Sequence, residues 1–326
     1  MLLYQSKTQN PYFNIATEEY FLKNFDKDFF YLYINEPSII VGKHQNTIAE
    51  INVPFAFENN FKVVRRLSGG GTVFHDTGNI NYCFIQKGVE GYLVDFKKYT
   101  EPILNTLKKL GVNAYLKGKS DLLIDNLKFS GNAEHVFRRK VLHHGTLLFA
   151  SELDQLNKAI KADWSKFNDK AVRSKRSMVT NIVDNLLQPI TIDEFKSEVL
   201  KTVLTESDDV EFYQLTKKDE EAINKLVREK YSTWEWNFGY SPKYEFVKTT
   251  VTDYGELSVI MKIEKGLIRN IQVTLNNQAF SESSLIELAI IDTPHHYLKI
   301  RDKLSQVFEN NQNLTLKLND ILELLF

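Results

Sequence analysis

Apolar residues recur along this chain with two spacings, and the spacing separates predicted helices from predicted strands. From Ile15 to Phe25, apolar side chains three and four residues apart fall on one face of a helix, for which Asn14 is a candidate cap. The run from Phe29 to Ile34 instead predicts a strand. Further helices are predicted at 97–110, 152–160, 192–204, 220–231, 300–308 and 321–326.

Strands and turns alternate with these helices. Thr191 precedes one helix with Glu194 three residues on, which predicts a capping box. Turns predict three hairpins, with arms at 72–74 and 80–85, at 136–139 and 141–149, and at 257–263 and 268–275. Other strands are predicted at 37–41, 113–116 and 122–124. The mixture indicates an α/β or α+β protein.

The pattern changes at residues 232–246, where glycine, serine and proline interrupt it. Because Pro and Gly often mark linkers, we predict a domain of residues 1–240 and a small α+β domain of residues 241–326. A length of 326 residues agrees with two domains.

Composition narrows the class of protein. Hydrophobic residues make up 43% of the chain and charged residues 25%, as in ordinary globular proteins. The formal net charge of -1 gives no reason to expect nucleic acid or a membrane as partner. No signal peptide or membrane-spanning run is visible. The single cysteine, Cys83, excludes an internal disulfide, and we expect a cytoplasmic protein.

Three adjacent glycines stand in the segment RRLSGGGTVFHDTGNINY, which runs from Arg65 to Tyr82. Glycine lets the backbone approach a ligand closely, and successive N–H groups can form a nest for anionic oxygen. Arg65 and Arg66 precede the glycines and supply charge suited to phosphate or carboxylate. Neither the P-loop nor the dinucleotide-binding motif is present. The segment predicts an anion site of another kind, with a flexible turn as the alternative.

Lys128 is the second candidate, because it precedes Gly131 in the segment KFSGNA. A lysine beside a close backbone approach can stabilise developing negative charge, although an exposed strand lysine is the alternative. Asp121 is the nearest preceding carboxylate, able to orient the lysine or to help bind Mg²⁺, or simply a turn residue.

The remaining candidates are histidines and the cysteine. His143 and His144 are adjacent on a predicted strand, so their side chains point to opposite faces and make a poor metal pair. His75 is suited to donate a hydrogen bond to an anion, and a structural hydrogen bond is the alternative. Cys83 stands in an apolar run, which predicts a buried, inert thiol.

Taken together, the segment at 65–82, KFSGNA at 128–133 and HHGTLLF at 143–149 resemble the motifs of lipoate-protein ligases in order and spacing. GKHQN at 42–46 and RSKRSMVTN at 173–181 resemble two further family segments. The resemblance implies a biotin-ligase-like mixed-sheet α/β catalytic domain with a small α+β C-terminal domain. It also implies two half-reactions, in which lipoate and ATP form lipoyl-AMP and pyrophosphate, and an acceptor lysine then takes the lipoyl group.

The resemblance also implies roles for individual residues. Lys128, in the motif K-x-x-G-[NS]-A, would be catalytic and touch both substrates. ATP, used with Mg²⁺, would be bound by Arg65, Gly71, Thr72, Val73, Phe74 and Lys128. Lipoate would be bound by Ser68, Gly69, Gly70, His75, Lys128, His144 and Gly145. Asp121 is the candidate metal ligand, and residues 170–181 match a segment that folds over the adenylate.

The implied acceptors are the lipoyl domains of 2-oxoacid dehydrogenase E2 subunits and the glycine-cleavage H protein, and we expect a monomer. No general base for the transfer is assigned, and the preference between lipoate and octanoate stays open. Three alternatives remain at this stage: an octanoyltransferase with a cysteine nucleophile, a biotin ligase, and a non-catalytic protein that binds lipoyl domains or nucleotides.

Overall fold

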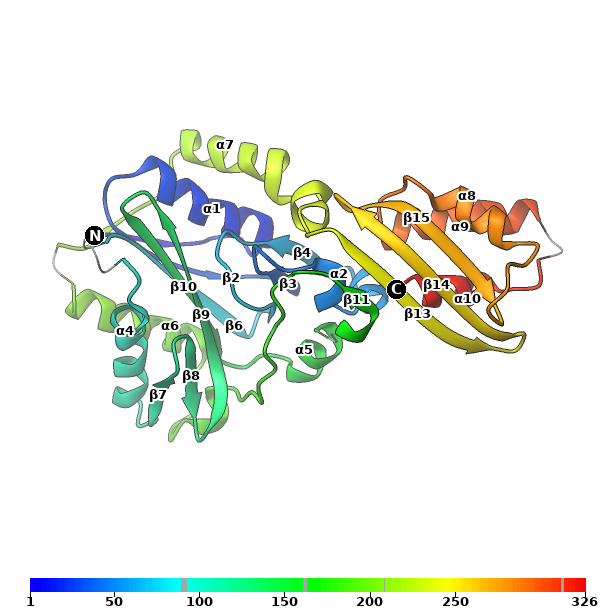
Figure 1. The fold of residues 1–326 in the computed structure, drawn as a ribbon. Coiled ribbons are helices and arrows are strands. Elements are labelled where there is room, and N and C mark those ends of the chain that lie inside the picture. The colour runs from blue at the N-terminus through cyan, green and yellow to red at the C-terminus, as the bar shows by residue number, and fades with distance from the viewer. Residues whose placement is uncertain (89–92, 161–162, 208, 312–313) are drawn as a thin grey trace. The chain divides into compact units, whose positions relative to one another are not determined.

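The computed structural model describes residues 1–88, 93–160, 163–207, 209–311 and 314–326 (Figure 1). The chain divides into two compact units. The first unit comprises Met1–Lys43, Lys62–Asn157 and Ser174–Thr233, and the second comprises His44–Phe61, Lys158–Arg173 and Trp234–Phe326. Two segments from within residues 1–240 thus cluster with the C-terminal part, and a functional boundary at residue 240 stays a prediction.

Within the described residues, the first unit is built on an eight-stranded mixed sheet and a three-stranded sheet. The larger sheet has parallel pairs at one edge, where β1 pairs with β2 and β12, and antiparallel pairs elsewhere. In spatial order its strands are β12 (Glu211–Phe212), β1 (Leu2–Gln5), β2 (Phe29–Ile34), β6 (Asn79–Lys87), β10 (Lys140–Leu148), β9 (Leu127–Phe137), β8 (Asp121–Ile124) and β7 (Ala114–Lys117). The smaller sheet has the order β4 (Lys62–Arg65), β3 (Ser38–Val41) and β5 (Val73–His75).

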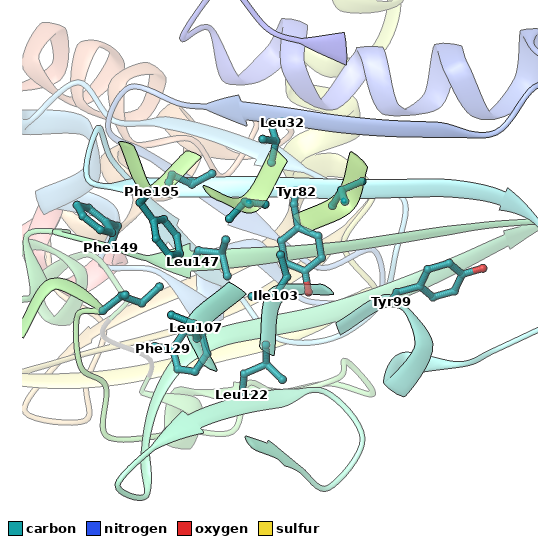
Figure 2. Close-up of a cluster of buried hydrophobic side chains, with 14 of the residues drawn as sticks. Leu32, Tyr82, Tyr99, Ile103, Leu107, Leu122, Phe129, Leu147, Phe149 and Phe195 are labelled. Carbon is teal, nitrogen blue, oxygen red and sulfur yellow. The ribbon is translucent and has the colours of Figure 1, made fainter. Parts of the chain in front are cut away.

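Helices cover both faces of the large sheet, with α1 (Pro11–Asn24) and α7 (Lys217–Leu226) on one side and α4 (Phe96–Lys109) and α6 (Ile192–Thr205) on the other (Figure 1). The side chains of strand β2 are buried on both faces of the sheet. Leu32 belongs to the core cluster that includes residues of α4 and α6 (Figure 2). Its neighbour Tyr31 packs against Phe21 of α1 on the other face. Burial of each such side chain contributes roughly 1.5–3 kcal/mol. A strand buried on both faces reads as a continuous apolar run, as it does here.

The helix caps confirm one prediction and correct another. Thr191 and Glu194 form the predicted capping box at the start of α6. At α1, however, the cap is Asn10, whose side chain accepts a hydrogen bond from the N–H of Tyr12, and Pro11 occupies the first helical turn. The proposal of Asn14 as cap was wrong, because a proline at the first position suits a helix start. Asn14 lies inside the helix and is buried.

The hairpin predicted across residues 75–78 does not form. Strand β5 pairs with β3, and β6 pairs with β2 and β10 in the other sheet. The predicted turn exists, since Asp76 accepts hydrogen bonds from the N–H groups of Gly78 and Glu152. A side chain at Gly78 would collide with the carbonyl oxygen of Ala150. The turn therefore passes the chain from one sheet to the other.

The second unit contains a four-stranded sheet in the order β11 (Phe167–Asn168), β13 (Tyr244–Thr252), β14 (Gly255–Glu264) and β15 (Leu267–Leu275). The predicted hairpin of β14 and β15 is confirmed, with Lys265 and Gly266 at positive φ in its turn. Part of the predicted linker is instead the start of β13. The helices of this unit are α2 (Thr47–Glu50), α3 (Val53–Glu58), α8 (Ser283–Ile290), α9 (Tyr297–Asn310) and α10 (Leu318–Leu325).

Shorter elements complete the described chain: α5 (Leu153–Ala159), two 3₁₀ turns (Trp164–Lys166 and Val183–Asn185) and two π-helical turns (Val227–Tyr231 and Glu235–Gly239). None of the helices in the described ranges has the length and apolar character needed to span a bilayer. The predicted mixed-sheet α/β fold, with an α+β C-terminal part, is confirmed.

Candidate functional site

A cavity of about 230 Å³ lies in the first unit, lined by the glycine loop (residues 66–72) and by residues of β5, β9 and β10. Most of the predicted site residues meet here. Those that line the cavity are Gly70, Gly71, Thr72, Val73, His75, Asp121, Lys128, His144 and Gly145. Its wall also has apolar side chains, among them Ile15, Tyr33 and Ile40. The cavity thus combines an apolar slot with a cationic and glycine-rich part.

Lys128 is held by an irregularity between β8 and β9. The register shifts between Leu122 and Leu123, so Gly131 lies opposite Asp121 while Lys128 lies opposite Leu123. The Lys128 Nζ is 2.9 Å from the Asp121 Oδ1. A β-carbon at Gly131 would lie 3.1 Å from the Lys128 Nζ, so glycine leaves room for the lysine to fold back along its own strand. A side chain at residue 131 would therefore crowd the ammonium group of Lys128.

Arg66 shapes the glycine loop from inside. Its Nη2 donates to the carbonyl oxygens of Gly69 and Gly71 at 2.7 Å, and its Nη1 donates to that of Ile40 at 3.1 Å. Gly70 between them has φ +88°, a conformation that favours glycine. Burial lowers the pKa of Arg66 to about 10, so the guanidinium stays charged at neutral pH. Arg66 therefore both lines the cavity and fixes the loop.

Four predicted site residues do not line the cavity: Arg65, Ser68, Gly69 and Phe74. Arg65 is fully buried, and its Nη1 donates to the carbonyl oxygens of Gly42 and Lys43, both at 3.0 Å. This contact ties GKHQN, a segment of the resemblance, to the start of the glycine loop. Adjacent residues of an extended chain point to opposite sides, which places Arg66 rather than Arg65 at the cavity.

Ser68 lies directly behind the cavity wall, in a buried network with His144 and Glu18. The Ser68 Oγ is 2.6 Å from the His144 Nε2, and the His144 Nδ1 is 2.8 Å from the Glu18 Oε2. Tyr33 donates a further hydrogen bond to Glu18. The network joins α1, β10 and the glycine loop, and so fixes the His144 ring that faces the cavity.

A serine, a histidine and a carboxylate in this order also make up a nucleophilic triad. Here the Ser68 side chain is fully buried, and its Oγ also accepts a hydrogen bond from the Arg66 Nε at 3.0 Å. An attacking oxygen must reach the substrate, and this one does not line the cavity. The arrangement therefore positions the loop.

His143 points to the other face of β10, as predicted, where its Nδ1 lies 2.9 Å from the Glu134 Oε1. Cys83 on β6 is fully buried and lies outside the cavity lining. Burial, with a smaller contribution from Glu18, raises the pKa of the Cys83 thiol well above its ordinary value. A thiol so placed is a poor nucleophile because little of it is thiolate.

Gly145 lines the cavity at a position where only glycine fits. A β-carbon there would lie 2.1 Å from the Asn132 Oδ1 and 2.6 Å from the ring of Tyr82. Tyr82 donates a 2.5 Å hydrogen bond to that amide oxygen, and the Asn132 Nδ2 donates to the carbonyl oxygen of Ser120. The glycine is therefore needed for the hydrogen-bonded contact between β6 and β9 beside it.

The segment of residues 174–180, part of the stretch 170–181 that the resemblance matched, contacts both the glycine loop and the lysine strand. The Ser174 Oγ accepts a 2.9 Å hydrogen bond from the N–H of Thr72, and Ser174 and Lys175 line the cavity. Farther on, the N–H of Lys128 donates to the carbonyl oxygen of Met178, and the N–H of Thr180 donates to that of Lys128. The segment thus connects the glycine loop with the backbone of the lysine strand.

Several residues of the site were not assigned from the sequence. They are Glu18, Asn35, Asn132 and Ser174, whereas Arg66 was named as a source of charge but given no binding role. The sequence does carry a signal for Glu18, because two adjacent acidic residues are unusual within an apolar helix. In the structure both are buried. Asn132 and Ser174 lie within segments that the resemblance identified, whereas the contact of Asn35 depends on the tertiary fold and leaves no local signal.

Residues 10–204 match the sequence-family model described as the lipoyl protein ligase A/B catalytic domain. The chain is 40% identical over 299 residues to lipoate–protein ligase 1 of Staphylococcus aureus, which covers 91% of each chain. A solved structure of a bipartite lipoate protein ligase and its E2 lipoyl domain from Thermoplasma acidophilum aligns with TM-score 0.63 and 26% identity, over 73% of this chain and 95% of that one. A crystal structure of lipoate-protein ligase A bound with ATP aligns with TM-score 0.61 and 26% identity, over 73% of this chain and 98% of that one.

Proposed function

Because the chain belongs to the family of lipoate-protein ligases, it is an enzyme that attaches lipoate to proteins, and we propose that it does so in two steps at the cavity around Lys128. First, a carboxylate oxygen of lipoate attacks the α-phosphorus of ATP, and pyrophosphate leaves. Next, the amine of an acceptor lysine attacks the carbonyl carbon of lipoyl-AMP and loses a proton, and AMP leaves. The observation that supports this best is that Lys128, residues of the glycine loop and several apolar side chains line one cavity.

Lys128 is the proposed catalytic residue of the first step. The attacking acid is already ionised at neutral pH, so the step needs charge stabilisation and no general base. An ammonium group beside the carboxylate and the α-phosphate offsets the charge that builds up there. Removal of one such donor typically costs on the order of 10² to 10³ in rate.

The proposed ATP contacts are Arg65 and the residues Gly71 to Phe74, together with Lys128. Backbone N–H groups in a glycine-rich turn suit phosphate oxygens, and Gly71, Thr72 and Val73 line the cavity. Arg65 does not line the cavity, and its guanidinium donates hydrogen bonds to the carbonyl oxygens of Gly42 and Lys43. Because Arg65 is fully buried and lies outside the cavity lining, its proposed contact with ATP requires that its side chain move.

Asp121 is the proposed protein ligand for Mg²⁺ that accompanies ATP. The cavity offers this ion a small donor set, which fits a metal that is also held by phosphates and waters. One carboxylate lines the cavity, and no cluster of three or more metal-binding side chains occurs in the described ranges. Mg²⁺ in nucleotide sites is usually bound by one or two carboxylates, with phosphates and waters completing the shell, so a single aspartate suffices. A bound ion would neutralise charge on the pyrophosphate, while Asp121 also orients Lys128.

The segment of residues 174–180 is proposed to shield lipoyl-AMP. A mixed anhydride hydrolyses in water, so the enzyme must exclude water between the two steps. Ser174 and Lys175 already line the cavity, and Ser174 contacts the backbone of Thr72. The segment already connects the glycine loop with the backbone of Lys128, and from there it would cover the adenylate.

The proposed acceptors are E2 lipoyl domains and the glycine-cleavage H protein. The first is supported by the Thermoplasma acidophilum structure of a similar ligase with its E2 lipoyl domain. The second rests on the resemblance of the sequence motifs. We also propose a monomer in the cytoplasm, a reducing compartment in which the single buried thiol stays free.

The experiment that tests this function follows the mass of a purified lipoyl domain, and separately of H protein, after incubation with the enzyme. With ATP, Mg²⁺ and lipoate together, we expect both acceptors to gain one lipoyl group, and neither to gain it when ATP is omitted. Modification from octanoyl-carrier protein without ATP would instead indicate the acyltransferase, and modification by biotin the biotin ligase. Buried Cys83 disfavours the first of these alternatives.

A further inference from the structure

Four buried polar side chains form a hydrogen-bonded chain that ends at the cavity. Tyr31 donates to the Asn14 Oδ1 at 2.9 Å, and the Asn14 Nδ2 donates to the Asn35 Oδ1 at 2.8 Å. The Asn35 Nδ2 lies 2.9 Å from the Nδ1 of His75, which lines the cavity. Asn14, Tyr31 and Asn35 are each fully buried, and none of them lines the cavity.

The direction of this chain is fixed by backbone carbonyl groups, which only accept hydrogen bonds. The Asn14 Nδ2 donates to the carbonyl oxygens of Thr8 at 3.0 Å and Ile34 at 3.3 Å, which settles which end of this amide carries hydrogens. The same nitrogen faces Asn35, so the Asn35 atom that accepts there is its oxygen. The Asn35 atom that faces His75 is therefore the NH₂ group, which only donates.

It follows that the Nδ1 of His75 is an acceptor without a proton, and that the proton of the neutral ring sits on Nε2. Burial, with smaller contributions from the charges of Arg66 and His144, lowers the pKa of His75 to about 3. The ring is therefore neutral at physiological pH. Since Nδ1 is occupied by Asn35, the N–H at Nε2 is the polar group that His75 offers to a ligand in the cavity.

We propose that Asn35 is a positioning residue that holds His75 in the tautomer protonated at Nε2, so that this N–H donates a hydrogen bond to a carboxyl oxygen of the acid being activated. The inference rests on the proposed function for the identity of that acid. A fixed neutral donor needs no reorientation when negative charge builds up on the carbonyl oxygen during attack by the acceptor amine. It also avoids neutralising the acid carboxylate, which must stay nucleophilic in the first step.

The most direct test is the protonation of the imidazole nitrogens, measured by ¹⁵N NMR on histidine-labelled protein. We expect His75, assigned with the variant His75→Gln, to carry its proton on Nε2. His295 gives an internal reference, because its Nδ1 lies 2.8 Å from the Tyr244 hydroxyl and its Nε2 lies 2.8 Å from the carbonyl oxygen of Leu325, which fixes the same tautomer independently. A proton on the Nδ1 of His75 in the natural chain would overturn the inference, whatever the variants do.

The variant Asn35→Asp replaces the donor by an acceptor of nearly the same shape. We expect the His75 proton to move to Nδ1 while His295 is unchanged, and kcat for lipoate-dependent pyrophosphate release to fall by about 10- to 100-fold, as for other partners that orient a functional histidine, with the KM for ATP preserved. The control Asn126→Asp makes the same change at an exposed turn and leaves both readouts as they are. An unchanged His75 tautomer in a folded Asn35→Asp variant would contradict the positioning role.

Titration with lipoate in the absence of ATP separates this inference from the proposed function. We expect the Nε2 resonance of His75 to shift as lipoate saturates the natural chain. If lipoate saturates without that shift, the inference fails and the ligase activity is unaffected. If no lipoate binds and no pyrophosphate is released, the proposed function fails, and the role of His75 as a donor to the acid fails with it.

Discussion

The Lys128 Nζ and the Asp121 Oδ1 are 2.9 Å apart, on neighbouring strands whose register shifts beside them. Both side chains are partly exposed and line the same cavity, so the pair is accessible to a ligand. An exposed ion pair contributes little to stability. The aspartate therefore matters mainly for where it holds the ammonium group and for the charge it offers a metal ion.

The first prediction concerns that aspartate. Asp121→Asn keeps the shape of the side chain but removes its charge, so the variant should need about 10-fold more Mg²⁺ for half-maximal pyrophosphate release and should have a lower kcat. A magnesium titration of both proteins measures this. If kcat falls while the magnesium requirement stays the same, Asp121 orients Lys128 and does not bind the ion.

A second prediction uses the glycine loop. In Gly70→Ala, the new methyl group meets the Arg66 Nη2 at 3.1 Å in a conformation with φ +88°. Such strain costs on the order of 1–3 kcal/mol in unfolding free energy, and displacement of Arg66 should also raise the KM for lipoate. Gly118→Ala is the matched control, because Gly118 also has positive φ but a β-carbon there would meet no other atom within 4 Å. Equal effects on KM in both variants would contradict the role of the Arg66 contact.

The third prediction concerns stability at low pH. Burial lowers the pKa of His75 to about 3 and that of His295 to about 4, so both stay neutral in the folded protein where the unfolded chain takes up protons. The free energy of unfolding should therefore fall as the pH drops below about 6.5, by about 1.4 kcal/mol per unit for each histidine. Urea unfolding of the natural chain and of His295→Gln should show a shallower fall for the variant down to about pH 4. Identical slopes would show that His295 is not held neutral.

The fourth prediction separates the ligase from a cysteine-dependent acyltransferase. Cys83→Ser should retain ATP-dependent lipoylation of a lipoyl domain, because the thiol is fully buried and lies away from the cavity. Some loss of stability is expected from burying a hydroxyl. A folded variant with no acyl transfer at all would mean that the thiol takes part in the chemistry.

Local patterns predicted much of this fold. The spacing of apolar residues located most helices and strands, and the capping box at Thr191 was confirmed. The pairing of β5 with β3 was missed because pairing between distant strands depends on the whole sheet, which a local turn does not reveal. The start of β13 at Tyr244 was missed because the glycine and proline of residues 232–246 interrupt the apolar pattern just before the strand begins.

In the candidate site, too, local features were predicted from the sequence and contacts between distant segments were not. Lys128 and the glycine loop were found from the sequence because each has a glycine whose role is local. The sequence could not show which of Arg65 and Arg66 lines the cavity, because that depends on which side of the strand faces it. Glu18 and Asn35 reach the site through α1 and the end of β2, and only the packed structure brings them to His144 and His75.

The measurement that tests the central claim most directly is pyrophosphate release from ATP and Mg²⁺ with lipoate, compared between the natural chain, Lys128→Ala and Lys117→Ala. Lys117 is an exposed lysine on the nearby strand β7 and lies outside the cavity, so its variant controls for the loss of a charge. We expect lipoate to drive release in the natural chain and in Lys117→Ala, and Lys128→Ala to lose on the order of 10² to 10³ in rate. Full activity in a folded Lys128→Ala variant would contradict the assignment of adenylation to this lysine.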